Sequence, residues 1–205
     1  ESGVGIGIDA DIDAKVPVST GAELCMAGAH IIANPAASPE LIGSAFARRN
    51  SILQKSKDGL CAHIYSSSGT FESSSCGIYS GHCIIAESGT LLCEDSRIVL
   101  DGKMILNDID YGSLRYERLG TALSGSSDSL LPDGFHNVKL RPLPILKEDS
   151  PLKRIFPRTP FIPSVSSDLE ANCREAFDIQ STSLARRLLH TGAKKAVLGV
   201  SGGLD

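Results

Sequence analysis

The chain has 205 residues, of which 41% are hydrophobic and 5% aromatic, and its formal net charge is -4. This length is enough for one ordinary globular domain, or for one domain and part of another. A net negative charge gives no long-range attraction for a nucleic-acid polymer, and the few aromatic side chains offer little stacking surface, so we expect no nucleic-acid partner. No apolar run approaches the roughly 18 residues of a membrane-spanning helix, so we expect no membrane partner and a cytoplasmic location.

The cysteines and aspartates give no metal-site pattern. None of the six cysteines forms a Cys-x-x-Cys pair or stands at zinc-ligand spacing from a histidine, so we expect reduced, mainly structural thiols. The alternating Asp9, Asp11 and Asp13 invite comparison with a calcium loop. Such a loop needs glycine at its sixth position and glutamate at its twelfth, where Ala14 and Thr20 stand, so we expect a solvated strand end instead.

Apolar strands and helical patterns alternate in the first third of the chain. We expect strands over residues 4–8, 30–34 and 62–66, a short helix over 20–28, and a longer helix over 39–57 that Pro39 opens. This β-α-β-α-β order, with strands that read as buried on both faces, predicts an α/β fold with parallel pairing.

The pattern changes after Ser68. Residues 82–87 and 90–93, separated by Ser88-Gly89, predict a hairpin, and residues 103–110 predict a further strand. A helix over 114–118 is expected to end this domain, which spans 1–119. Seven prolines between 120 and 163 favour a linker, given the bounds 120–165. The last part, 166–205, reads as a helix over 168–190, with Asp168 in its first turn, then a strand over 197–200.

The chain ends on "VLGVSGGLD", a strand pattern followed by a turn of small residues. Backbone N–H groups of such a turn can converge on a phosphate, which would make Ser201, Gly202 and Gly203 ATP contacts. The carboxylate of Asp205 could then hold Mg²⁺ that bridges the phosphates. The lysine of a Walker A loop is missing, and an ordinary structural turn explains Ser-Gly-Gly-x-Asp on its own equally well.

Five segments resemble known enzymes, and the three that lie before residue 165 follow the same order as in one family. "AVLGVSGGLD" is similar to the pyrophosphatase loop of ATP-dependent amide-forming enzymes. "FDIQSTSLARRLL", "MAGAHIIANPAASPELIG", "GHCIIAESGTLL" and "RTPFIPS" resemble segments of the long, glutamine-dependent NAD synthetases, so the resemblance covers nearly the whole chain. It implies the C-terminal part of a nitrilase-like αββα glutaminase sandwich, a linker, and the first helix and strand of an adenine nucleotide alpha hydrolase-like, Rossmann-like domain.

The resemblance also implies a reaction. In this family the glutaminase domain releases ammonia from glutamine, and the synthetase domain uses ATP and Mg²⁺ to convert nicotinic acid adenine dinucleotide into NAD. Both small molecules would be partners of the parent enzyme, and the family suggests a homo-oligomer. We expect this chain to be a fragment of such an enzyme, inactive by itself.

The expected glutaminase nucleophile is replaced. The family context G-V-E-I-C-E-D-L-W-V-P resembles "GIDADIDAKVP", and this match puts Asp11 at the position of the cysteine. A carboxylate cannot form the thioester that the mechanism needs. A silenced site is therefore favoured over Asp11 as an alternative nucleophile.

At other positions, some residues of this chain match those usual in the family and others do not. Ser38 resembles the serine that contacts glutamine, although an N-cap role before Pro39 explains it as well. Glu72, in "GTFESSS", resembles the acid of the loop near the glutamine site, whereas Ser44 stands where a basic residue is usual. His82 is expected to make a structural hydrogen bond at a strand start. Two alternatives to the ligase stay open: a non-catalytic nitrilase-like scaffold, and another nitrilase-superfamily carbon-nitrogen hydrolase.

Overall fold

The computed structural model describes residues 3–10, 18–72, 74–75, 77–121, 123, 135–141, 151–156, 158–159, 162 and 166–203. The chain divides into two compact units, Glu1–Ile155 and Phe156–Asp205. The bounds expected from the sequence, 1–119, 120–165 and 166–205, stay predictions.

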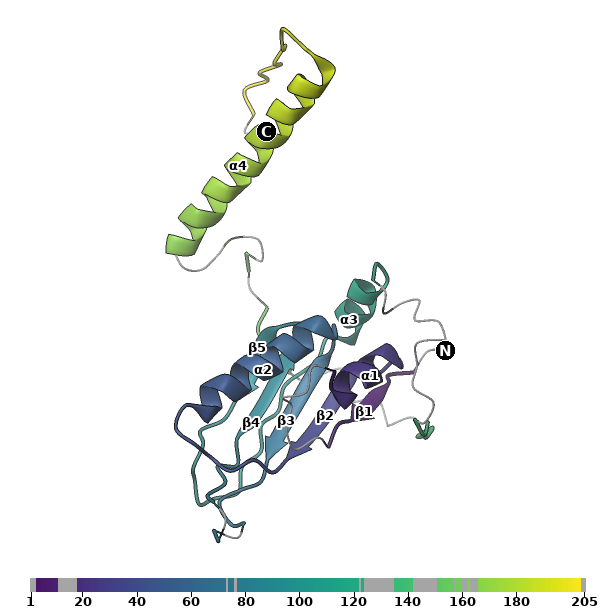
Figure 1. The fold of residues 1–205 in the computed structure, drawn as a ribbon, viewed down its shortest axis with the longest axis vertical. Helices are drawn as coiled ribbons and strands as arrows, with labels where there is room; N and C mark the ends of the chain where they lie inside the picture. The colour runs from purple at the N-terminus through teal and green to yellow at the C-terminus, as the bar shows by residue number, and fades with distance from the viewer. Residues whose placement is uncertain are drawn as a thin grey trace. The chain divides into compact units, whose positions relative to one another are not determined.

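A mixed sheet of five strands forms the centre of the first unit (Figure 1). Its strands, adjacent in sequence order, are β1 (Ile6–Ile8), β2 (Ile31–Ala36), β3 (Ala62–Ser67), β4 (Cys83–Glu87) and β5 (Thr90–Glu94). The pairs β1–β2 and β2–β3 are parallel, as the alternating order predicts. The pairs β3–β4 and β4–β5 are antiparallel, and the second of these is the predicted hairpin.

Two crossover helices cover one face of this sheet. Helix α1 (Thr20–Met26) packs on β1 and β2, and α2 (Ser44–Asp58) packs on β3, β4 and β5, both on the near face in Figure 1. One buried cluster beneath α1 consists of Cys25, Ala29, Ile32 and Cys61. A second cluster beneath α2 consists of Ile52, Tyr65, Ile84 and Ala86. The core therefore lies between the sheet and these helices.

Side-chain caps begin the two shorter helices of this unit. Ser19 Oγ accepts a hydrogen bond from Ala22 N at 3.3 Å before α1. Asp110 Oδ1 accepts one from Ser113 N at 2.9 Å before α3 (Tyr111–Arg118). Each cap satisfies a helix-terminal N–H that has no partner within the helix.

Four sequence expectations are corrected. The helix expected from Pro39 begins at Ser44, after Gly43, whose φ of +81° is left-handed. Residues 103–110 and 197–200, all of them described, form no strand. Strand β1 is not buried on both faces, since Ile6 and Ile8 are 60% and 70% exposed. Alternating side chains of a strand point to opposite faces, so β1 carries an uncovered apolar face.

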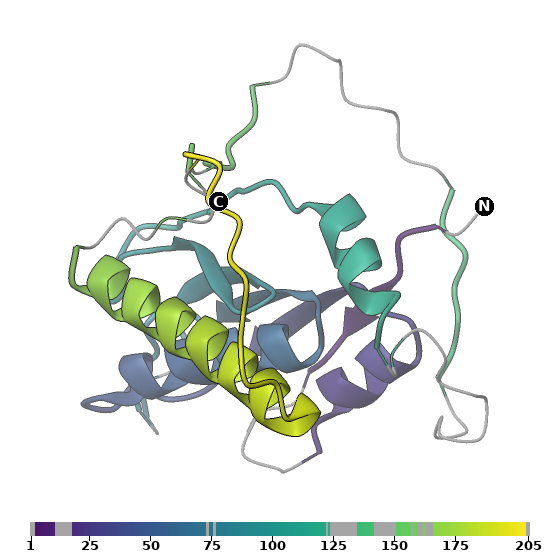
Figure 2. The same ribbon diagram turned by 90° about the horizontal axis from the view of Figure 1, so that it is seen from above.

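The second unit contains α4 (Ser166–Thr191), which ends at Gly192 with φ +65°. Asp168 lies in its first turn, as expected, and most of its described side chains are exposed. A view turned by 90° shows α4 as one continuous helix, followed by the extended C-terminal segment (Figure 2). No helix within the described ranges is both long enough and apolar enough to span a membrane.

Candidate functional site

Polar groups gather where β1, β2 and β3 end. Because these strands are parallel, their carboxyl ends meet at one edge of the sheet, a common location for ligand sites in α/β folds. Asp9, which follows β1, is fully buried, and its main-chain oxygen accepts a hydrogen bond from the side-chain amide of Asn34. At the end of β3, the hydroxyl of Ser67 is buried and has no partner within the described part of the chain. This edge therefore offers polar atoms suited to an amide or carboxylate ligand.

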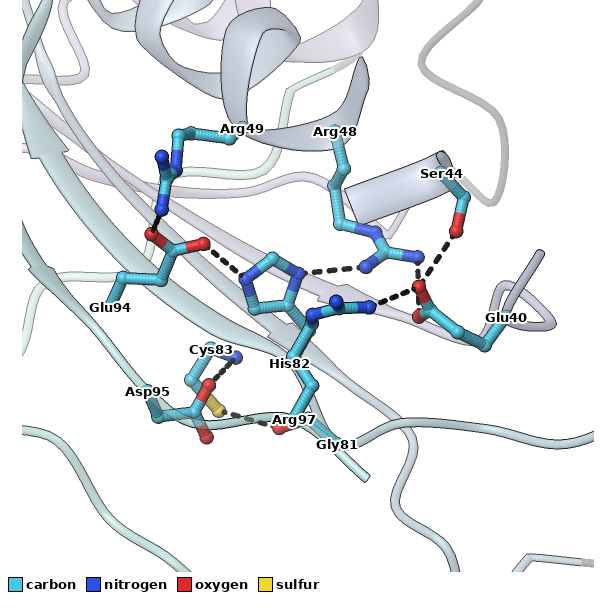
Figure 3. A network of polar contacts seen from close by, with 10 residues as sticks. All are labelled: Glu40, Ser44, Arg48, Arg49, Gly81, His82, Cys83, Glu94, Asp95 and Arg97. Carbon is cyan, nitrogen blue, oxygen red and sulfur yellow. Dashed lines mark hydrogen bonds and ion pairs between the residues drawn. The ribbon is translucent and has the colours of Figure 1, made fainter. Parts of the chain in front are cut away.

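Glu40 anchors the segment that leaves this edge (Figure 3). Its side chain is 8% exposed, and its carboxylate receives Arg97 Nη1 at 2.7 Å, Ser44 Oγ at 2.8 Å and Arg48 Nη2 at 3.1 Å. Glu40 N donates to Ile78 O at 2.7 Å, which ties this segment to the loop after Glu72. One residue therefore joins two segments that each carry a predicted glutamine contact.

The same partners hold the Glu40 carboxyl group in its charged form. Burial alone would raise its pKa, but the hydroxyls of Ser80 and Ser44 and the charge of Arg48 lower the pKa to about 2. A carboxylate with this pKa serves as a fixed anion at neutral pH. It is unsuited to act as a general acid there.

His82 continues the network towards the sheet (Figure 3). Its ring is fully buried, with Nδ1 2.7 Å from Arg48 Nη1 and Nε2 2.8 Å from Glu94 Oε1. A guanidinium can only donate, so Nδ1 accepts, and the ring proton on Nε2 is donated to Glu94. Glu94 also pairs with Arg49. Burial lowers the pKa of His82, in agreement with this neutral tautomer.

This geometry makes His82 a structural residue, as the sequence predicts. Both ring nitrogens have protein partners, and the ring has no exposed surface for a substrate. The network links α2 to β4 and β5, and its function is to fix the backbone beside the strand ends.

The predicted glutamine contacts lie in segments that pack together. Ser38 is half-buried between β2 and α2, and Glu72 lies exposed in the turn after β3. A side chain at Gly77 would touch Pro39 at 3.0 Å, so the loop after Glu72 approaches the segment after Ser38 closely. The N-cap explanation of Ser38 is wrong, because α2 starts at Ser44 with Gly43 as its cap. The contacts of Ser38 and Glu72 with glutamine stay predictions, and Asp11 lies outside the described residues.

The C-terminal motif forms an open turn in the second unit. Gly202 has φ +83°, a left-handed conformation that favours glycine, and Gly203 N donates to Ser201 Oγ at 3.5 Å. All three residues are exposed, and a Cβ at Gly202 would meet no atom within 4 Å. The ATP contacts of Ser201, Gly202 and Gly203 stay predictions, and Asp205 lies outside the described residues. Within the described ranges, no three acidic, histidine or cysteine side chains group as a metal site.

The Glu40 network was not expected from the sequence, although one signal was present. Glu40, Ser44 and Arg48 follow one another at intervals of four residues, the spacing that places side chains on one face of a helix. Glu94 and Arg97 join this network because the second strand of the hairpin packs beside α2, and no local pattern in the sequence indicates that packing.

Comparison with the sequences of known proteins finds relatives from one group of enzymes. No family model matches the chain. Glutamine-dependent NAD(+) synthetases from Mycobacterium leprae and Mycobacterium tuberculosis are each 34% identical to it over 196 residues, which is 94% of this chain. The chain spans 29% of the length of each of these relatives.

Two solved structures have lower similarity. A glutamine-dependent NAD(+) synthetase from Cytophaga hutchinsonii has a TM-score of 0.35 and 24% identity, covering 46% of this chain and 14% of that one. Nit3 from Saccharomyces cerevisiae, a nitrilase-superfamily member of branch 10, has a TM-score of 0.44 and 19% identity, covering 58% of this chain and 42% of that one. The sequence match, which extends over nearly the whole chain, relates this protein to the glutamine-dependent NAD(+) synthetases.

Proposed function

We propose that this chain is part of a glutamine-hydrolysing NAD synthetase, a carbon-nitrogen ligase. The observation that carries the proposal is the alignment of 196 residues at 34% identity with enzymes of that name. The first unit ends at Ile155, so an alignment of this length includes residues of both units. A match confined to a nitrilase-like amidase would not extend into the second unit.

In this proposal the first unit is a piece of the nitrilase-like glutaminase. The sheet edge with Asp9, Asn34 and Ser67 supports it, because buried polar atoms there suit an amide substrate. Ser38 and Glu72 would contact glutamine. Asp11 in place of the cysteine would silence hydrolysis, because a carboxylate forms no thioester.

The second unit would be the start of the ATP-binding domain. The exposed, left-handed turn at Gly202 supports this assignment, because a glycine-rich turn of this kind can present main-chain N–H groups to a phosphate. Ser201, Gly202 and Gly203 would hold the pyrophosphate end of ATP, and Asp205 would hold Mg²⁺. ATP supplies the activation of the carboxylic acid of nicotinic acid adenine dinucleotide, which ammonia then converts to the amide.

The test compares two nitrogen donors with the complete protein that contains this chain. NAD formation is measured from nicotinic acid adenine dinucleotide, ATP and Mg²⁺, with either ammonium or glutamine. We expect ammonium to support the reaction and glutamine to fail, because only glutamine requires the nucleophile. An Asp11→Cys variant should gain glutamine-dependent activity, whereas the neighbouring Asp13→Cys variant should not.

Each alternative has its own outcome in this assay. Turnover of glutamine by the unchanged protein would contradict a silenced Asp11 site. A folded protein that forms no NAD with either donor would contradict the ligase and support the non-catalytic scaffold. The replacement of the cysteine by Asp11 is the observation that favours this second candidate.

A further inference from the structure

Two buried cysteines share one small space under α1. Cys25, near the end of α1, is 2% exposed, and Cys61, just before β3, is 1% exposed. A methyl group at Gly59 would lie 2.8 Å from Cys25 Sγ and 3.2 Å from Cys61 Sγ. Both sulfur atoms therefore approach the same point, and glycine at position 59 leaves the space that they occupy. Both thiols are free.

This pair lines a cavity. The cavity has a volume of about 340 Å³ and lies between α1, α2 and the sheet, partly open to solvent as far as the described residues define it. Cys25, Cys61, Gly59 and His63 all contribute to its wall. A small oxidant can therefore reach the sulfur atoms without unfolding of the core.

A buried cation lies beside the pair. Arg118 is 5% exposed and donates to Ala29 O at 2.7 Å, to Gly59 O at 2.9 Å and to Leu60 O at 3.0 Å. These carbonyl groups are neutral, so the contacts hold the guanidinium in place without cancelling its charge. A positive charge next to a thiol favours the thiolate, which is the nucleophilic form.

The two thiols differ in how easily they ionise. Hydrogen bonding from Cys61 lowers the pKa of Cys25 against the opposing effect of burial, and the charge of Arg118 lowers it further. Hydrogen bonding with Cys25 and burial raise the pKa of Cys61. Cys25 is therefore suited to attack first, with Cys61 as its resolving partner.

We propose that Cys25 and Cys61 form a peroxide-reactive thiol pair that closes to a disulfide. The Cys25 thiolate attacks one oxygen of a hydroperoxide, the O–O bond breaks, and the other oxygen leaves as an alcohol after taking a proton. Cys25 is then a sulfenic acid. Cys61 attacks this sulfur as it loses its proton, the S–O bond breaks, and water leaves. Two thiols have lost two electrons, and the hydroperoxide has been reduced to an alcohol and water, or to two water molecules when the oxidant is hydrogen peroxide.

This reaction is a property of the first unit alone, and it is independent of NAD formation. A closed disulfide would join the end of α1 to the residue that precedes β3. It would restrict the unfolded chain between residues 25 and 61, which stabilises the folded state.

The test uses the reduced 205-residue chain and hydrogen peroxide under native conditions. Remaining thiols are alkylated, the protein is digested, and mass spectrometry identifies cross-linked peptides. We expect a Cys25–Cys61 cross-link, with the mass of two hydrogen atoms lost from the intact protein. In Cys61→Ser, a dimedone adduct should accumulate on Cys25. The Cys83→Ser variant is the matched control, since Cys83 is half-buried and not part of the pair. In this variant the Cys25–Cys61 cross-link should form as in the unsubstituted chain.

Two results would contradict the proposed thiol pair. Oxidation of the exposed Cys173 without any Cys25–Cys61 cross-link would overturn the proposal. A cross-link that forms only in urea would also overturn it, because the reaction would then require unfolding. The measurement on the unsubstituted chain keeps this test valid if a serine variant fails to fold.

Discussion

At the scale of single residues, Glu40 stabilises the fold through its charge. Its carboxylate has three side-chain donors, and its pKa of about 2 lies below the ordinary value of 4.5. The unfolded chain binds the proton more readily, so this contribution is fully present above about pH 4.5 and is lost as the pH falls towards about 2.

The Glu40→Gln substitution tests this charge. We expect it to lower the free energy of unfolding by about 3 kcal/mol near neutral pH, because the charged partners lose their anion. Urea unfolding followed by circular dichroism measures the change. The difference between the two proteins should shrink in acid, where Glu40 itself becomes protonated.

A matched control keeps the same chemical change on the surface. Glu117 is exposed and accepts a hydrogen bond from Ser88 at 2.7 Å, an acceptor role that glutamine preserves. Glu117→Gln should alter the free energy of unfolding by less than about 0.5 kcal/mol. Equal losses in the two variants would contradict the role assigned to the Glu40 network.

His63 provides a second residue-scale prediction. It is 1% exposed, its Nε2 has no partner within the described residues, and burial, with a smaller effect of Lys55, lowers its pKa to about 4. Between the ordinary pKa of 6.5 and about 4, the unfolded chain binds a proton that the folded chain excludes. Stability should therefore fall as the pH is lowered through this window.

Nuclear magnetic resonance titration of the ring protons measures this pKa directly. We expect the His63 signals to shift near pH 4 while the protein stays folded, and those of the exposed His190 serve as the internal comparison. A midpoint for His63 near the ordinary value would show that solvent reaches its ring.

At the scale of elements, two glycines in equivalent helix positions differ in their surroundings. Gly21 is the second residue of α1, and Gly112 is the second residue of α3. A Cβ at position 21 would lie 2.7 Å from Asp9 Oδ2, whereas one at position 112 would lie 3.4 Å from Asp110 Oδ1, an ordinary contact. Helix propensity is the same at both positions, so packing alone separates them.

The pair of alanine variants tests this difference. Gly112→Ala should raise the free energy of unfolding by up to about 1 kcal/mol, because alanine loses less backbone entropy in a helix. Gly21→Ala should lower it by about 1–3 kcal/mol, because the buried Asp9 must move. Thermal unfolding of both variants gives the signs, and two shifts of the same sign would contradict the packing argument.

The same scale shows which elements follow from local pattern. The hairpin was predicted from Ser88-Gly89, and both residues adopt left-handed φ values, +44° and +84°, as a tight hairpin turn requires. The strand expected over 103–110 did not form. Alternating apolar residues indicate only that a segment is able to pair with a neighbouring strand. Pairing also needs a neighbouring sheet edge in register, which is a property of the whole sheet.

At the scale of the whole molecule, the two units differ in what stabilises them. The strands β3 and β4 are largely buried and hydrogen-bonded on both sides, whereas α4 exposes Phe177, Ile179, Leu184 and Leu189. A helix with little packing is marginally stable in water, since most helical stability in proteins comes from tertiary contacts.

Hydrogen exchange on the intact chain tests this contrast. We expect the amides of β3 and β4 to exchange much more slowly than those of α4, because opening α4 exposes little further apolar surface. Mass spectrometry after peptic digestion locates the exchange. Slow exchange throughout α4 would indicate that another surface covers it in solution.

The sequence by itself determined the order of the first five strands and of the helices, the parallel pairing of the first three strands, the hairpin, and the relation to the glutamine-dependent NAD(+) synthetases. These features follow from periodicity, turn residues and residue identity, which are local properties. Only the tertiary structure decided that Glu40, His82 and Glu94 form one network, that Cys25 meets Cys61, and that one face of β1 stays open. Such contacts join residues distant in the chain, and their geometry depends on how strands and helices pack.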